Sequence, residues 1–153
     1  MPSHTLPWIT GGSHCEVHWL FEGNKWDPKP FFDDHQYPGT QVRLERIVTM
    51  FACNGRLPSD KGHWRKGPPP HNKIYEFKDI PSGVRLLAFS HNPSQGECWF
   101  IVALGVTKDR GDITQEESER AVQRRQRFLD TALLTRSPES QLKPTETAAK
   151  RRR

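Results

Sequence analysis

Residues 73–104 read KIYEFKDIPSGVRLLAFSHNPSQGECWFIVAL, and this stretch decides the fold of the chain. It holds three short apolar runs, at 73–78, 84–89 and 98–104, and turn-forming residues separate them. Runs of this length that are bounded by Pro, Gly, Ser and Asn are typical of β-strands joined in hairpins. The third run is apolar at every position, which indicates a strand covered on both faces. The stretch therefore predicts a small antiparallel sheet.

The segment that follows the sheet predicts a helix with a capping box at its start. Glu117 stands three residues after Thr114, so the Thr114 hydroxyl can accept from the Glu117 amide while the Glu117 carboxylate reaches back. Acidic residues in the first turn and arginines further on complement the helix dipole. After Leu134 the chain becomes rich in Ser, Pro, Thr and Lys, so residues 135–153 are expected to form a disordered basic tail.

Two further elements are expected on the N-terminal side of the sheet. Residues 16–21 alternate apolar and polar side chains and predict a first strand. An apolar stripe at helical spacing predicts a helix that has Thr40 as its N-cap and ends at Gly55. Residues 1–15 show no period and are expected to be loose, while residues 56–72 form a long polar connection.

Length and composition limit the classes of protein to consider. The 153 residues and a hydrophobic content of 33% suit one α+β domain, placed over residues 16–134. No apolar run approaches the roughly 18 residues that a membrane span needs, and no secretory signal is recognisable. Three scattered cysteines, Cys15, Cys53 and Cys98, argue against a disulfide framework and indicate a reducing compartment. We therefore expect a cytoplasmic protein.

Basic side chains are concentrated in two parts of the chain. The formal net charge is +5, and most of the excess lies in residues 56–110 and 131–153. Uneven positive charge of this kind points to a polyanionic partner, although it also serves solubility. His14, Cys15 and His18 lack a second group of ligands at a metal-binding spacing, so neither a metal nor a cofactor is expected.

Four segments, taken together, resemble a known family. They are IYEFK at 74–78, RLLAF at 85–89, FIVALGVTK at 100–108 and TQEESERA at 114–121. This order is similar to that of the RelE/HigB toxin superfamily, and most of all to the phage-derived, HigB-like branch of these type II toxin–antitoxin toxins. The resemblance implies a RelE-like microfold, in which a small, twisted, mostly antiparallel sheet carries helices on one face and binds RNA on its opposite, concave face.

The resemblance also implies a function. Members of the family are mostly endoribonucleases that cut messenger RNA, many of them on the ribosome, and each is silenced by an antitoxin. We therefore expect a metal-free mRNA interferase whose partners are RNA, including ribosome-bound mRNA, and a cognate antitoxin protein. By resemblance, its cationic site residues are Lys78, Arg85, Lys108 and Arg110.

Cleavage of RNA without a metal needs a base for the 2′-OH, positive charge around the phosphorane and a proton for the leaving oxygen. Arg85 and Arg110 can clamp a phosphate, and Lys78 or Lys108 can stabilise charge or transfer a proton. Glu76 lies on the same strand face as Lys78 and is the candidate base. The alternative for these two residues is an exposed ion pair, which would be weak.

Aromatic and basic residues ahead of the first hairpin are candidates for RNA binding. Trp64 is placed to stack on a base, with cations around it that suit phosphate contacts. These RNA-binding candidates are Trp64, Arg65, Lys66 and Lys73. The imidazoles expected nearest to the site are those of His71 and His91, and His91 is expected to be solvated in its turn.

Two other functions remain open at this stage. A member of the family that had lost its acid and base would bind RNA or the ribosome without cleaving RNA. A phage or regulatory protein of the same fold would bind only protein. Binding of RNA at low salt separates the last possibility from the others, because phosphate contacts are strongest there.

Overall fold

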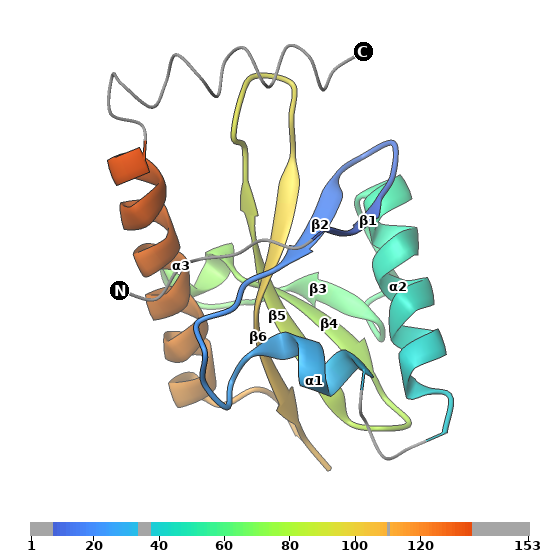
Figure 1. Ribbon diagram of the computed structural model, residues 1–153. Coiled ribbons are helices and arrows are strands. Elements are labelled where there is room, and N and C mark those ends of the chain that lie inside the picture. Colours follow the sequence, from blue (N-terminus) through green and yellow to red (C-terminus); the bar gives the residue numbers. More distant parts are fainter. Residues whose placement is uncertain (1–7, 34–37, 110, 136–153) are drawn as a thin grey trace.

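The computed structural model describes residues 8–33, 38–109 and 111–135 (Figure 1). Arg110 and nearly all of the tail predicted at 135–153 lie outside these ranges. The strands are β1 (Trp8–Gly11), β2 (Glu16–Trp19), β3 (Gly62–Trp64), β4 (Tyr75–Asp79), β5 (Val84–His91) and β6 (Trp99–Thr107). The helices are α1 (Pro28–Asp33), α2 (Thr40–Asn54) and α3 (Gln115–Thr135), with one 3-10 turn, η1, at His71–Lys73. Within the described ranges, no helix is long and apolar enough to cross a membrane.

The six strands form one open sheet in which most pairs are antiparallel. The strand order is β1-β2-β6-β5-β4-β3, with β2 parallel to β6 and all other neighbours antiparallel. The predicted stretch at 73–104 forms the β4–β5 hairpin and most of the β5–β6 pair. With three helices packed against this sheet, the predicted α+β fold is confirmed.

Hydrophobic layers lie on both faces of the sheet. On one face α2 packs through residues such as Leu44 and Phe51, with α1 beside it. On the other face α3 packs through Phe128 against Phe89 of β5. Figure 1 shows α2 and α3 on opposite sides of the strands. Each buried Leu or Phe side chain contributes roughly 1.5–3 kcal/mol. The expectation that helices cover only one face is therefore corrected, since α3 occupies part of the face that was expected to be open.

The helix α2 follows the amphipathic pattern of its sequence. Leu44, Ile47, Val48 and Phe51 recur at helical spacing, and all four are buried. Gly55 ends the helix with a left-handed φ of 76°, and its N–H donates to the Phe51 carbonyl at 2.7 Å. Both the stripe and the glycine cap were predicted, because they depend only on residues near in sequence.

The capping box at the start of α3 is also confirmed. The Glu117 amide donates to the Thr114 hydroxyl at 3.1 Å, and the Thr114 amide donates to the Glu117 carboxylate at 2.8 Å. Two of the amides that a helix start leaves unpaired are thereby satisfied. This cap fixes where α3 begins relative to the end of β6.

A second group of charged residues attaches α3 to the body of the protein. Arg124 is 2% exposed and donates to Glu22 at 2.9 Å and to Asp27 at 2.5 Å. Arg127 donates to the same Glu22 carboxylate. Asp27 in turn accepts the backbone amides of residues 22–24. We call Glu22, Asp27, Arg124 and Arg127 the Arg124 cluster.

Three local expectations are wrong. Thr40 is the first helical residue of α2, and Gly39, with a φ of 79°, takes the N-cap position without a side-chain hydrogen bond. Residues 8–11 form β1 inside the segment expected to be loose, and the connection at 56–72 contains β3. Both short strands are held by antiparallel pairing with the next strand along the chain, β1 with β2 and β3 with β4. Segments of three or four residues are too short to show a periodic pattern.

Candidate functional site

A buried carboxylate lies at the centre of the candidate site. Glu76 on β4 is 0% exposed and points to the α3 side of the sheet, because its neighbours Tyr75 and Phe77 point into the core under α2. Arg85 donates to Glu76 Oε2 at 2.9 Å, and Arg65 donates to Oε1 at 3.1 Å. A carboxylate is stable in such a place only when it is paired. The expectation that Glu76 is a base open to substrate is thus corrected.

Strand register brings the other members of the site together. Lys78 lies directly opposite Arg85, and His63 on the edge strand β3 lies directly opposite Glu76. The predicted ion pair between Glu76 and Lys78 is not formed, since the carboxylate is taken by the two arginines. His63 Nε2 stands 3.6 Å from Glu76 Oε1. We call these five residues, His63, Arg65, Glu76, Lys78 and Arg85, the Glu76 cluster.

The chain that leads into α3 covers part of the Glu76 cluster. Arg85 Nη2 donates to the Gly111 carbonyl at 3.2 Å, and Arg65 Nη2 donates to the Ile113 carbonyl at 3.3 Å. The side chains of Arg65 and Arg85 are 15% and 11% exposed. Within the described residues, the Nε atom of each arginine is buried without a hydrogen-bond partner. Both guanidiniums are therefore fixed in orientation and keep unused donor capacity.

The Glu76 cluster holds more positive than negative charge. Arg65, Arg85 and Lys78 are cations at neutral pH, and Glu76 is the single carboxylate among them. Lys78 is partly exposed and forms no ion pair with any described residue. The low dielectric of a half-buried site strengthens the attraction of such an excess for an anion. The arrangement thus suits a phosphate group that approaches along the β3 edge.

His63 adds a titratable group to this cluster. Its side chain is 28% exposed. Burial lowers the pKa of His63, and the charges of Lys78 and Arg65 lower it further, while Glu76 and a backbone hydrogen bond at Ser59 act in the opposite direction. The net direction is downward, so the imidazole is neutral at neutral pH. A neutral imidazole beside cations can accept a proton.

Lys108, expected from the family resemblance to be a site cation, is engaged elsewhere. Its ammonium lies 2.8 Å from the Glu117 carboxylate in the capping box of α3. Burial alone would raise the pKa of Glu117, but hydrogen bonds from Lys108 and the Thr114 amide lower it overall. The absence of a side chain at Gly83 allows the chain at Lys108 to approach closely, because a Cβ on residue 83 would sit 2.1 Å from the Lys108 carbonyl oxygen. Lys108 therefore fastens α3 to the β4–β5 hairpin.

The other predicted RNA-binding residues lie along the edge of the sheet. Trp64 on β3 is 46% exposed, and its ring packs edge-on against Tyr75 at 5.2 Å between centroids. Lys66 and Lys73 are exposed, as predicted, whereas Arg65 belongs to the Glu76 cluster. We call the exposed residues Arg56, Lys61, Trp64, Lys66 and Lys73 the basic edge. Asp60 is the one acidic residue in the whole segment 56–73.

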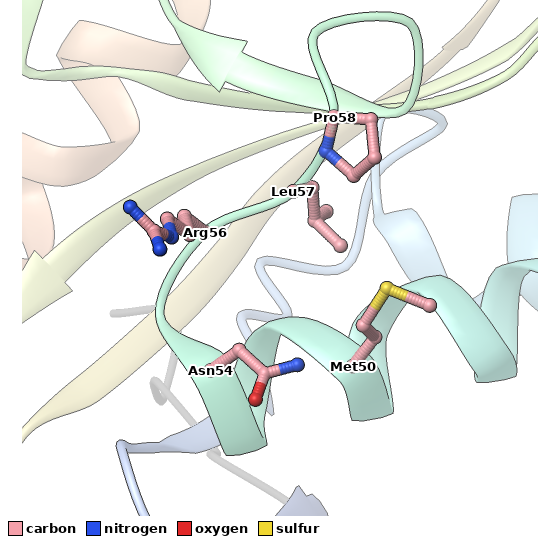
Figure 2. A pocket seen from close by; sticks show the side chains of 5 residues that line it. All are labelled: Met50, Asn54, Arg56, Leu57 and Pro58. Atoms are coloured by element: carbon pink, nitrogen blue, oxygen red, sulfur yellow. The ribbon is translucent and has the colours of Figure 1, made fainter.

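A recess opens beside the basic edge, between the end of α2 and the loop that leads to β3 (Figure 2). Met50, Leu57 and Pro58 give it an apolar wall, and Asn54 and Arg56 supply polar groups. Met50 is 36% exposed, which leaves a small apolar surface in contact with solvent. The recess extends the basic edge onto the α2 face of the molecule.

Sequence reasoning missed His63 because it placed residues 56–72 in a connection without strands. The imidazoles expected nearest to the site lie elsewhere: His71 Nδ1 is 2.8 Å from the Ser118 hydroxyl, and His91 contacts the rings of Trp99 and Phe128. The alternation of Gly62, His63 and Trp64 is too short to predict a strand. Only the pairing with β4 shows that His63 faces Glu76.

Comparisons with other proteins give no family for this chain. No protein-family model, no curated protein and no solved structure matches it. Within the described residues, no group of three His, Cys, Asp or Glu side chains could hold a metal ion. The candidate site therefore stands on its own geometry and charge.

Proposed function

We propose that the protein binds RNA, with a phosphate at the Glu76 cluster and a base on the basic edge. The observation that carries this proposal is the unbalanced charge of the cluster, in which one buried carboxylate serves two arginines while Lys78 has no partner among the described residues. A fixed cationic group of this kind is preorganised for a phosphate, because the arginines need no reordering when it arrives.

Trp64 supplies the second half of the proposed contact. Its ring packs edge-on against Tyr75, and Trp64 is 46% exposed. Bases of single-stranded RNA stack on exposed aromatic rings of this kind, and lysines beside the ring contact the backbone. Lys66 and Lys73 are exposed on the same edge of the sheet. The ring lies on the α2 side of the sheet and the Glu76 cluster on the α3 side, so a single strand of RNA that crosses the β3 edge would meet both.

Binding of a fluorescently labelled single-stranded RNA at increasing salt tests the proposal. We expect log K to fall linearly with log salt, because each neutralised phosphate releases counterions. Lys78→Ala should weaken binding and reduce the salt slope by about one contact. Arg46→Ala, which removes an exposed cation from α2, is the matched control and should leave both unchanged. A wild-type chain that fails to bind RNA at low salt would contradict the proposal.

A second candidate function is cleavage of the bound RNA, as in the RelE/HigB endoribonucleases. The observation that favours it is the register that sets Lys78 directly opposite Arg85, two of the residues that the resemblance assigns to the site. Cleavage without a metal would leave a 2′,3′-cyclic phosphate and would proceed in EDTA. Action on ribosome-bound mRNA, silencing by an antitoxin and a cytoplasmic location belong to the same proposal.

A further inference from the structure

We infer that His63 is the group that takes the proton from the 2′-OH of an RNA held at the Glu76 cluster. The inference rests on the proposed RNA binding and adds to it a specific cleavage step. It gives the site a base other than Glu76, the residue that the sequence predicted for this role.

The other ionisable groups of the site do not meet the requirements for a base. Glu76 is fully buried and both of its oxygens accept from arginines. Arg65, Arg85 and Lys78 carry positive charge at neutral pH and cannot accept a proton. His91 stands six residues beyond Arg85 on β5, which is roughly 20 Å at about 3.3 Å per residue.

The position of His63 meets the requirements for a base. It lies on the edge strand, it is 28% exposed, and its Nε2 is 3.6 Å from the Glu76 carboxylate. This distance is longer than a hydrogen bond, so Glu76 does not occupy the ring, which is oriented by its hydrogen bond at the Ser59 backbone. Once the ring gains a proton, the buried carboxylate stabilises the imidazolium, as an acidic partner does for catalytic histidines elsewhere.

The charged groups around His63 keep it ready to accept a proton. From β4, Glu76 and Lys78 face the ring; from the chain after β3, Arg65 faces it; and the Ser59 backbone bonds to it. Arg85 of β5 reaches the same carboxylate from the far side. Burial, followed by Lys78, lowers the pKa of His63, so most of the imidazole is unprotonated at neutral pH.

The proposed step is a transesterification that consumes no water. The imidazole of His63 takes the 2′-OH proton as the 2′-oxygen forms a bond to the adjacent phosphorus. The bond from phosphorus to the 5′-oxygen breaks, and the ammonium of Lys78 gives that oxygen a proton. The products are a 2′,3′-cyclic phosphate and a 5′-hydroxyl end, and solvent exchange restores both side chains. Positive charge from Lys78 and Arg85 stabilises the phosphorane.

Cleavage and binding measured on the same samples test the inference. The full chain and its His63→Gln variant are given an end-labelled single-stranded RNA in EDTA, free in solution and loaded as messenger on ribosomes. We expect His63→Gln to bind RNA within about threefold of wild type and to cleave it 10²–10⁴-fold more slowly. His71→Gln is the matched control, because glutamine can keep the contact with Ser118, and it should cleave like wild type.

The pH dependence of the wild-type chain gives a readout that needs no variant. We expect the cleavage rate to fall on the acidic side as the imidazole becomes protonated, and this acidic limb to be absent from the residual rate of His63→Gln. A wild-type chain that binds RNA but never cleaves it, a His63→Gln chain that cleaves at the wild-type rate, or a rate without an acidic limb would overturn the inference and leave RNA binding intact. Absence of RNA binding would remove the proposed function and the inference together.

Discussion

Two groups of charged residues join α3 to the rest of the molecule, and they differ in charge balance. The Arg124 cluster sets two arginines against two carboxylates, and its central Arg124 is 2% exposed. The Glu76 cluster sets two arginines and a lysine against one carboxylate, with 11–15% of each arginine exposed. Arg127 of the Arg124 cluster is 49% exposed, so the difference between the two groups lies in their charge balance. A balanced group holds elements together, whereas a group with spare positive charge can also attract an anionic ligand. The comparison separates a structural role from a binding role.

The largest expected effect belongs to the balanced group. Arg124→Ala leaves the carboxylates of Glu22 and Asp27 in a buried place without their main cation. We expect the free energy of unfolding to fall by about 3–5 kcal/mol, measured by urea denaturation. RNA affinity of the remaining folded protein should not change. A stability loss below about 1 kcal/mol would show that this group is not what fastens α3.

The corresponding change in the unbalanced group should separate stability from binding. Glu76→Gln removes the carboxylate that Arg65 and Arg85 share and leaves two buried cations uncompensated. We expect a loss of stability of about 3 kcal/mol, since the glutamine oxygen can still accept one N–H. RNA affinity should stay level or rise, because the variant gains positive charge. Weaker RNA binding by a folded Glu76→Gln protein would argue against a phosphate at this cluster.

Much of the frame of the protein could be predicted, and most of the site could not. The β4–β5–β6 strands, the stripe of α2 and the capping box at Thr114 follow from residues close in sequence, and all three are confirmed. That Arg85 shares a strand face with Leu87 also follows from alternation. By contrast, the burial of Glu76 depends on Arg65 and on the chain that leads into α3, which no local pattern shows.

The side of the sheet that α3 occupies also could not be predicted from the sequence. The weak apolar stripe of α3 fits either face, and the tie to Glu22 spans 102 residues. For the same reason, Lys108 was expected to be a site cation and instead bonds to the cap of α3. The ion-pair partner of a charged residue is seen only in the folded structure, because any cation can pair with any carboxylate.

A smaller effect is expected at the aromatic residue of the basic edge. Trp64→Ala removes the ring proposed to stack on a base, and stacking is worth about 1–3 kcal/mol per base. Affinity for single-stranded RNA should fall about five- to 150-fold in a fluorescence titration. Its salt dependence should stay as in wild type, because stacking releases no counterions. An affinity equal to that of wild type would place RNA away from Trp64.

The smallest expected effect concerns pH. The folded protein lowers the pKa of His63 below its usual value of about 6.5, so the unfolded chain binds the proton more readily. The contribution of His63 to stability is therefore complete above about pH 6.5 and is lost as the pH falls towards the lower, folded pKa. The fall in unfolding free energy over that window should be shallower in His63→Gln than in wild type. Parallel curves for the two proteins would contradict the lowered pKa.

The central claim is that the spare charge of the Glu76 cluster binds the RNA backbone, and a charge reversal tests it most directly. Lys78→Glu brings the cluster close to the balance of the Arg124 cluster, while Arg46→Glu makes the same change in net charge on α2. RNA affinity of the two variants is compared at low and at physiological salt. We expect Lys78→Glu to lose binding at both salt concentrations and Arg46→Glu to bind nearly as well as wild type. Equal affinities for the two variants would show that only the net charge of the chain matters and would contradict the account.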